Sequence, residues 1–114
     1  MMHLVLVVDI RGEVDQSGLD RLRTHIKLTK RGRLTDDWDQ EFGYRIVDTP
    51  SGQRFNVGLF REFDGSWLVD ASASSANVDS NELSLLRTEL VEGITAAGYQ
   101  ATVRDKPTFG PAPT

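Results

Sequence analysis

The stretch FGYRIVDTPSGQRFNVGLFREFDGSWLVDASA, residues 42–73, decides the fold of this chain. It contains three runs of alternating apolar and polar residues, and the runs are separated by residues that favour turns. The turns are expected at Thr49–Gly52 and at Asp64-Gly65. Clean alternation indicates strands with one buried and one solvated face, as in an antiparallel sheet. We therefore expect three sequential strands within residues 42–73.

The same alternation predicts which side chains face the interior of the protein and which face solvent. In the first run, the side chains expected on the apolar face are Phe42, Tyr44 and Ile46. In the other two runs they are Phe55, Val57, Leu59, Trp67, Val69, Ala71 and Ala73. Unless another chain covers it, the opposite, wet face is expected to carry Arg45, Arg54, Asn56 and Asp70.

A strand and a helix are expected before this region. The apolar run Leu4–Ile10 is typical of a strand that is buried on both faces, or nearly so. An amphipathic helix over residues 18–30 follows from the i, i+3, i+7 spacing of Leu19, Leu22 and Ile26. Its expected N-cap is Ser17, and its expected C-cap is Gly32.

A second helix and a last strand are expected after residue 73. The helix is indicated by a long apolar stripe, which consists of Leu83, Leu86, Leu90, Ile94 and Ala97. Asp79 and Glu82 form a cap-like pair before it, and Gly98 is expected to end it. The alternation of Tyr99, Ala101 and Val103 then predicts a strand, so the element order is β-α-β-β-β-α-β.

This order predicts an α+β two-layer sandwich. We expect a mainly antiparallel sheet of about five strands with both helices on one face, arranged as a ferredoxin-like variant. The expected domain boundaries are residues 1–105 for a single domain and 106–114 for a Pro-rich, disordered tail.

Composition excludes several classes of protein. The chain has 114 residues, 39% of them hydrophobic and 26% charged, which fits one folded domain. It has no cysteine, which excludes disulfides, thiolate nucleophiles and zinc–thiolate sites. The apolar run Leu4–Val8 is short and no Lys or Arg precedes it, so we expect neither a signal peptide nor a membrane span. The expected location is the cytoplasm.

The charge is unevenly distributed along the chain. The net charge is −4, yet residues 11–33 hold seven of the 13 Lys and Arg residues. The segment KRGRLTDDWDQE, Lys30–Glu41, changes from basic to acidic in its middle and contains Trp38. Trp38 has two interpretations: it packs back onto the core, or it anchors a contact with a partner.

No motif for catalysis, metal binding or phosphate binding is complete. His3 and His25 have no partner at a metal-binding or catalytic spacing. Asp37, Asp39 and Glu41 are spaced as in an EF-hand loop, but Phe42 occupies the position where that loop needs glycine. We therefore predict no catalytic residue, no metal site and no cofactor.

Three functional hypotheses follow. The first is a small non-enzymatic binding or adaptor domain that contacts a protein partner or a second copy of itself. Its expected surface comprises Lys27, Lys30, Arg31, Arg33, Asp37, Trp38 and Asp39. The second is nucleic-acid binding through a basic helix face formed by Arg23, Lys27 and Lys30. The alternative interpretation of these residues is a solvated helix face whose charges are favourable near the helix end. The third is a metal-dependent hydrolase that uses the acids of residues 36–41.

Overall fold

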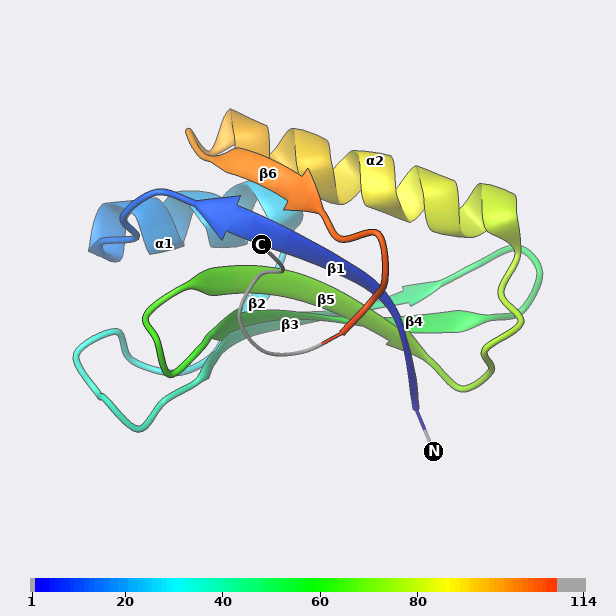
Figure 1. The fold of residues 1–114 in the computed structure, drawn as a ribbon, viewed down its shortest axis with the longest axis horizontal. Coiled ribbons are helices and arrows are strands. Elements are labelled where there is room, and N and C mark those ends of the chain that lie inside the picture. Colours follow the sequence, from blue (N-terminus) through cyan, green and yellow to red (C-terminus); the bar gives the residue numbers. More distant parts are fainter. Residues whose placement is uncertain (1, 109–114) are drawn as a thin grey trace.

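A computed structural model of the protein describes residues 2–108. The elements follow one another as β1 (His3–Arg11), α1 (Gln16–Ile26), β2 (Thr29–Lys30), β3 (Glu41–Asp48), β4 (Arg54–Arg61), β5 (Trp67–Ala73), α2 (Ser80–Ala96) and β6 (Gln100–Val103). The strands form one open antiparallel sheet in the order β2-β3-β4-β5-β1-β6 (Figure 1). The predicted α+β sandwich is confirmed, with six strands rather than about five. Within residues 2–108, neither helix is long and apolar enough to cross a membrane.

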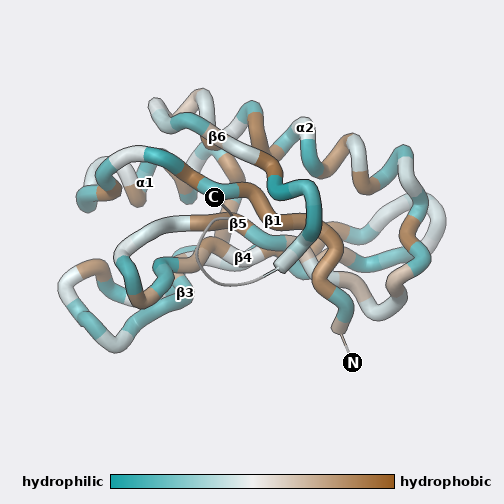
Figure 2. The backbone as a smooth tube through the Cα atoms, in the orientation of Figure 1, coloured by the Kyte–Doolittle hydropathy of each residue, from teal (hydrophilic) through white to brown (hydrophobic). Residues whose placement is uncertain are grey.

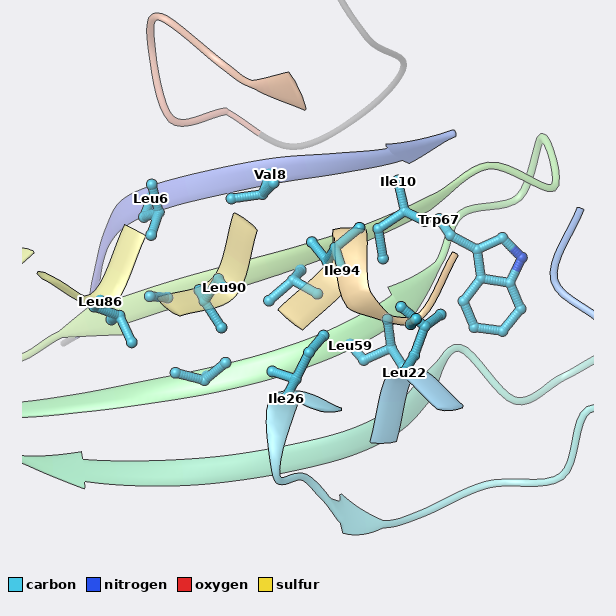
Figure 3. Close-up of a cluster of buried hydrophobic side chains, with 14 of the residues drawn as sticks. Leu6, Val8, Ile10, Leu22, Ile26, Leu59, Trp67, Leu86, Leu90 and Ile94 are labelled. Carbon is cyan, nitrogen blue, oxygen red and sulfur yellow. The ribbon is translucent and has the colours of Figure 1, made fainter. Parts of the chain in front are cut away.

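The hydrophobic core lies between the two helices and one face of the sheet (Figure 3). The helices contribute Leu19, Leu22, Ile26, Leu86, Leu90 and Ile94. The sheet contributes the apolar faces of β1, β4 and β5, including Leu6, Val8, Ile10, Phe55, Leu59 and Val69. Figure 2 shows hydrophobic residues concentrated in β1 and alternating with hydrophilic ones along α2. Both helices therefore cover the same face, and we call the other face of the sheet the open face.

The predicted N-cap is correct for α2 and wrong for α1, and the C-cap of α2 is Ala97, one residue before the predicted Gly98. The Asp79 carboxylate accepts hydrogen bonds from the backbone N–H groups of Asn81 and Glu82, as expected of an N-cap. At α1 the N-cap is Asp15, whose Oδ1 accepts from the Gly18 N–H at 2.7 Å. Ser17, the predicted cap, already lies inside the helix.

Helix α1 ends at Ile26, four residues before its predicted end at residue 30. Lys27 adopts the left-handed conformation, with φ of 61°, and caps the helix in place of Gly32. The chain then turns into β2, which pairs with β3 through Thr29 and Lys30. Leu28, which lies between Lys27 and Thr29, packs against the core. The early end therefore lets Leu28 become partly buried against the core and adds a short strand to the sheet edge.

Replacing Lys27 by glycine should stabilise the protein. A left-handed non-glycine residue costs about 1–2 kcal/mol, whereas the greater freedom of glycine in the unfolded chain costs roughly 0.5–1 kcal/mol. We expect a net gain of about 0.5–1 kcal/mol for Lys27→Gly, or ~2–6 °C in Tm. Thermal unfolding would measure it, and Lys27→Ala is the control because it removes the charge but keeps the strain. Equal Tm values for the two variants would contradict this explanation.

A β-bulge in β3 reverses the predicted faces of that strand. The register with β4 shifts between Glu41 and Gly43, and one extra residue moves every following side chain to the opposite face. Phe42 stays buried in the core as predicted. Arg45, expected on the wet face, instead points to the helices, where its Nη1 donates to the Glu89 carboxylate at 2.9 Å. Tyr44 and Ile46, expected in the core, lie on the open face.

The segment after β6 is attached to the open face through Arg104. Its guanidinium forms two hydrogen bonds of 2.8 Å with the Asp9 carboxylate, and its Nη1 donates to the Thr108 carbonyl. Its backbone N–H also donates to the carbonyl of Val7 in β1. Of the predicted tail, residues 106–108 contain no helix or strand, and 109–114 lie outside the described residues.

Candidate functional site

Two exposed aromatic side chains lie at one end of the sheet. Trp38 is in the connection between β2 and β3, and Phe63 is in the turn between β4 and β5. Their side chains are 91% and 94% exposed, respectively. Figure 1 shows both connections at the same end of the sheet. We call residues 31–40 together with residues 62–66 the aromatic end.

Arg61, the last residue of β4, holds the two parts of the aromatic end together. Its guanidinium donates to the backbone carbonyls of Leu34, Asp36 and Asp39 at 2.8–3.1 Å. Its backbone N–H donates to the Gln40 carbonyl. The guanidinium also lies 4.8 Å from the centre of the Phe42 ring. A partly buried arginine therefore orders the long connection that carries Trp38.

Several acids of the aromatic end have structural roles. Asp36 accepts a hydrogen bond from the Trp38 N–H, and Asp39 accepts one from the Arg33 N–H at 2.7 Å. In the other turn, the Ser66 hydroxyl donates to Asp64 and lowers the pKa of that carboxyl. Asp37, next to Trp38, is exposed. These bonds fix the backbone conformations that place Trp38 and Phe63 in solvent.

The structure answers the question about Trp38 and separates the residues predicted to act with it. Trp38 does not pack back onto the core. Of the predicted partner-binding residues, those within the aromatic end are Arg31, Arg33, Asp37, Trp38 and Asp39. Lys27 lies at the end of α1 and Lys30 in β2, and both are exposed. Sequence reasoning missed Phe63, although an aromatic residue directly before Asp64-Gly65 is a signal of exposure in a turn.

The basic helix face predicted for nucleic-acid binding does not form. Arg23 is only 6% exposed, and its guanidinium donates to the carbonyls of Phe42 and Arg31 at 2.8 and 2.7 Å. Burial lowers the pKa of Arg23, and the nearby Asp20 carboxylate partly offsets this effect. Lys27 and Lys30 lie beyond the end of the helix. Arg23 is therefore not available on the helix surface. Lys27 lies at the C-cap of α1 and Lys30 lies in β2, so the three residues do not share one helix face.

The acids of residues 36–41 do not form a metal site in the structure. Within residues 2–108, no group of three His, Asp or Glu side chains is placed to hold a metal ion. Glu41 instead forms an ion pair with Arg31 at 3.4 Å. The hydrolase hypothesis therefore has no set of ligands among the described residues.

A second feature is a groove on the open face over β3, β4 and β5, with a volume of about 330 Å³. Its lining residues include Tyr44, Ile46, Asn56, Phe60, Asp70 and Ser72. We call it the Asp70 groove. Asp70 was expected on a solvated face, but it is only 6% exposed. Its neighbour on that face of β5 is Leu68, which is also buried. An apolar residue at this position of the sequence indicates that this face of the strand is not fully exposed to solvent.

Burial changes the acidity of Asp70. Loss of contact with water, helped by the negative charges of Glu41 and Glu62, raises the pKa of this carboxyl to about 7. A hydrogen bond from the Gly58 backbone N–H has the opposite, smaller effect. A carboxyl group with a strongly perturbed pKa in a groove is a common property of functional sites, although structural groups share it.

The aromatic end and the Asp70 groove are therefore the two candidate sites, and they differ in character. The first presents apolar surface to solvent, whereas the second is a recess with a titratable group inside it. Comparison with protein-family models, with curated proteins and with solved structures gave no match to this chain.

Proposed function

We propose that this chain is a small non-enzymatic binding domain that acts through protein–protein contacts at the aromatic end. The observation that carries the proposal is the exposure of two large aromatic side chains, Trp38 and Phe63, on connections tied together by Arg61. Leaving such side chains in water forgoes roughly 1.5–3 kcal/mol of burial for each, which a partner with an apolar pocket would recover. Aromatic residues are also the commonest energetic anchors of protein interfaces.

The charged residues around these anchors would orient the partner. Arg33 and Asp37, which precede Trp38 in the same connection, are both exposed. Exposed charges at the rim of an interface mainly set the association rate and the choice of partner, rather than the affinity. We infer that the sign change in residues 30–41 serves this steering role, and that the aromatic side chains provide the binding energy.

The test is a double substitution at the aromatic end. We expect Trp38→Ala/Phe63→Ala to weaken partner binding at least ~30-fold, because the loss of even one interface anchor costs about 2 kcal/mol or more. Unfolding of the free protein should be nearly unchanged, since both side chains are almost fully exposed. The binding partner would be identified by photo-crosslinking from position 35, which is exposed and leaves both aromatic side chains in place, and affinity would be measured by calorimetry.

Leu85 provides the matched control. It is a large apolar residue of α2 that is 72% exposed, and it does not belong to the aromatic end. Leu85→Ala should leave partner affinity unchanged. If it weakened binding as much as the double substitution, or if the double substitution had no effect, the aromatic end would not be the interface.

We also propose a fold variant, a location and a mode of self-association for the protein. We propose a ferredoxin-like variant in which β1, α1, β4, β5, α2 and β6 form the basic unit, with β2 and β3 added at one edge; the order β4-β5-β1-β6 supports it. We also keep a cytoplasmic location and self-association through an edge strand as proposals. Nucleic-acid binding stays the alternative hypothesis, with Lys27 and Lys30 as its exposed residues.

A further inference from the structure

The Asp70 groove combines a buried carboxyl group with aromatic and apolar walls. Asp70 lies on β5 between Gly58 of β4 and Val7 of β1. No ion pair joins it to a Lys, Arg or His side chain within residues 2–108. Tyr44 and Phe60 supply aromatic rings to the lining, and Ile46 and Met2 supply apolar surface. A carboxylate in such surroundings lacks the counter-charge that would stabilise it.

We propose that the Asp70 groove is a binding site for an organic cation, an alkylguanidinium or alkylammonium group, with the Asp70 carboxylate as its counter-ion. The groove shares Arg31 with the aromatic end, but neither Trp38 nor Phe63 lines it, so each proposal is tested by its own substitutions. Aromatic walls around a carboxylate suit such a ligand, because ring faces attract cations and the alkyl part contacts apolar surface.

Gly58 determines the shape of the groove beside Asp70. A Cβ atom at this position would lie 2.5 Å and 2.9 Å from two carbons of the Phe60 ring, and 3.2 Å from Asp70 Oδ1. The ring of Phe60 therefore occupies the space that a side chain at position 58 would need. This arrangement keeps an aromatic ring close to the carboxylate.

The rim of the groove already holds one guanidinium group in this manner. Arg31 lies 4.6 Å from the centre of the Tyr44 ring, and its Nη1 is 3.4 Å from the Glu41 carboxylate. An aromatic face and a carboxylate thus hold a cation at the edge of the recess. Tyr44 also lines the groove, and Asp70 supplies a second carboxylate deeper in it. The same chemistry is therefore repeated at the buried position, where no Lys, Arg or His side chain of residues 2–108 forms an ion pair with Asp70.

The charges around Asp70 favour a cationic ligand. Glu41 approaches from β3 and Glu62 from the end of β4, and both disfavour the charged form of Asp70. On the β1 side, Asp9 is neutralised by its two hydrogen bonds with Arg104. Arg31 is paired with Glu41 at the rim. A bound cation would offset the excess negative charge, and it would select the ionised form of Asp70.

Binding should therefore be coupled to proton release. Because the pKa of Asp70 is raised to about 7, most of this carboxyl is protonated at pH 6 and most is ionised at pH 8. A cation that requires the ionised form should bind about ten-fold more tightly at pH 8 than at pH 6. A neutral ligand that fills the same space would not show this dependence.

The experiment is an NMR titration of the ¹⁵N-labelled protein with n-butylguanidinium, n-butylammonium and, as the uncharged match, n-butylurea. We expect saturable shifts of the Gly58, Asp70 and Tyr44 amides with at least one cation, tighter at pH 8 than at pH 6, and none with n-butylurea. Asp70→Asn should abolish these shifts. Glu92→Gln, which changes the net charge equally at an exposed position of α2, should retain them.

Several results would overturn the proposal. These are the absence of saturable shifts with both cations, equal binding of n-butylurea, and unchanged binding by Asp70→Asn. A well-dispersed spectrum of Asp70→Asn would show that a loss of binding does not come from unfolding. Concentration-dependent broadening of the same amides without any probe would assign the groove to a second copy of the chain, and would also contradict the proposal.

Discussion

Asp70→Asn should make the protein more stable than the wild type at alkaline pH, and the difference should grow between pH 5 and pH 8. Burial raises the folded-state pKa of Asp70 from 3.8 to about 7. The folded protein thus retains a proton that the unfolded chain has lost, and stability falls as pH rises through the folded-state pKa. From these pKa values we expect the wild type to lose about 2–3 kcal/mol between pH 5 and pH 8 relative to Asp70→Asn.

Urea unfolding at pH 5, 6, 7 and 8 would measure this difference. Glu92→Gln is the matched control, because it removes one negative charge from an exposed position of α2, and its profile should run nearly parallel to that of the wild type. Parallel profiles for wild type and Asp70→Asn would show instead that the Asp70 carboxyl is well solvated. That result would remove the coupling between cation binding and proton release as well.

Arg23→Ala should destabilise the protein by about 3–4 kcal/mol, a large effect for an arginine on a helix. The guanidinium donates to the carbonyls of Phe42 and Arg31, and more weakly to Gly32 at 3.5 Å. Its removal leaves buried carbonyl groups without these donors, at a cost of roughly 1–3 kcal/mol for each unsatisfied group, and it also opens a cavity beside the core. Denaturant midpoints would measure the loss.

Two variants separate the role of hydrogen bonding from that of charge. Arg23→Lys keeps the charge but not the planar set of donors, so it should recover little of the lost stability. Arg87→Ala removes an exposed arginine from α2. Within residues 2–108, the side chain of Arg87 forms a hydrogen bond only with the Ser84 hydroxyl. This substitution should change stability by less than about 0.5 kcal/mol. Comparable losses for Arg23→Ala and Arg87→Ala would mean that the buried hydrogen bonds add nothing.

The parts of the fold that could be predicted are those with an uninterrupted hydrophobic period. Leu86, Leu90 and Ile94 mark the buried face of α2 correctly, and Phe55, Val57 and Leu59 do the same for β4. In β3 the alternation predicts the wrong face for the residues after the bulge, because the bulge inserts one residue into the register after Glu41. A bulge is a property of two paired strands, so the sequence of one strand does not reveal it.

The candidate sites were harder to predict because burial of a polar group depends on its neighbours in space. Arg23 lies four residues after Leu19 and three before Ile26, so its position on the buried face could have been noticed. Its hydrogen-bond acceptors, however, are the carbonyls of Arg31, just after the predicted helix, and of Phe42, in the first predicted strand, and no pattern indicated that either would lie beside Arg23. Asp70 looked like an ordinary polar residue in an alternating strand. Its surroundings depend on the residues that β1, β3 and β4 bring next to it.

The position of β1 between β5 and β6 has a consequence for synthesis of the chain. Val7 pairs with Asp70 on one side, and Val8 pairs with Val103 on the other, so both partners of β1 are made long after it. Until then, the apolar segment Leu4–Ile10 has no native strand beside either of its edges. Unpaired apolar strands are prone to wrong pairing with other chains, and sheets built from distant segments form slowly. The sheet can be completed only when β6 has left the ribosome. Between the synthesis of β1 and that of β6, the nascent chain would benefit from chaperones that bind extended apolar segments.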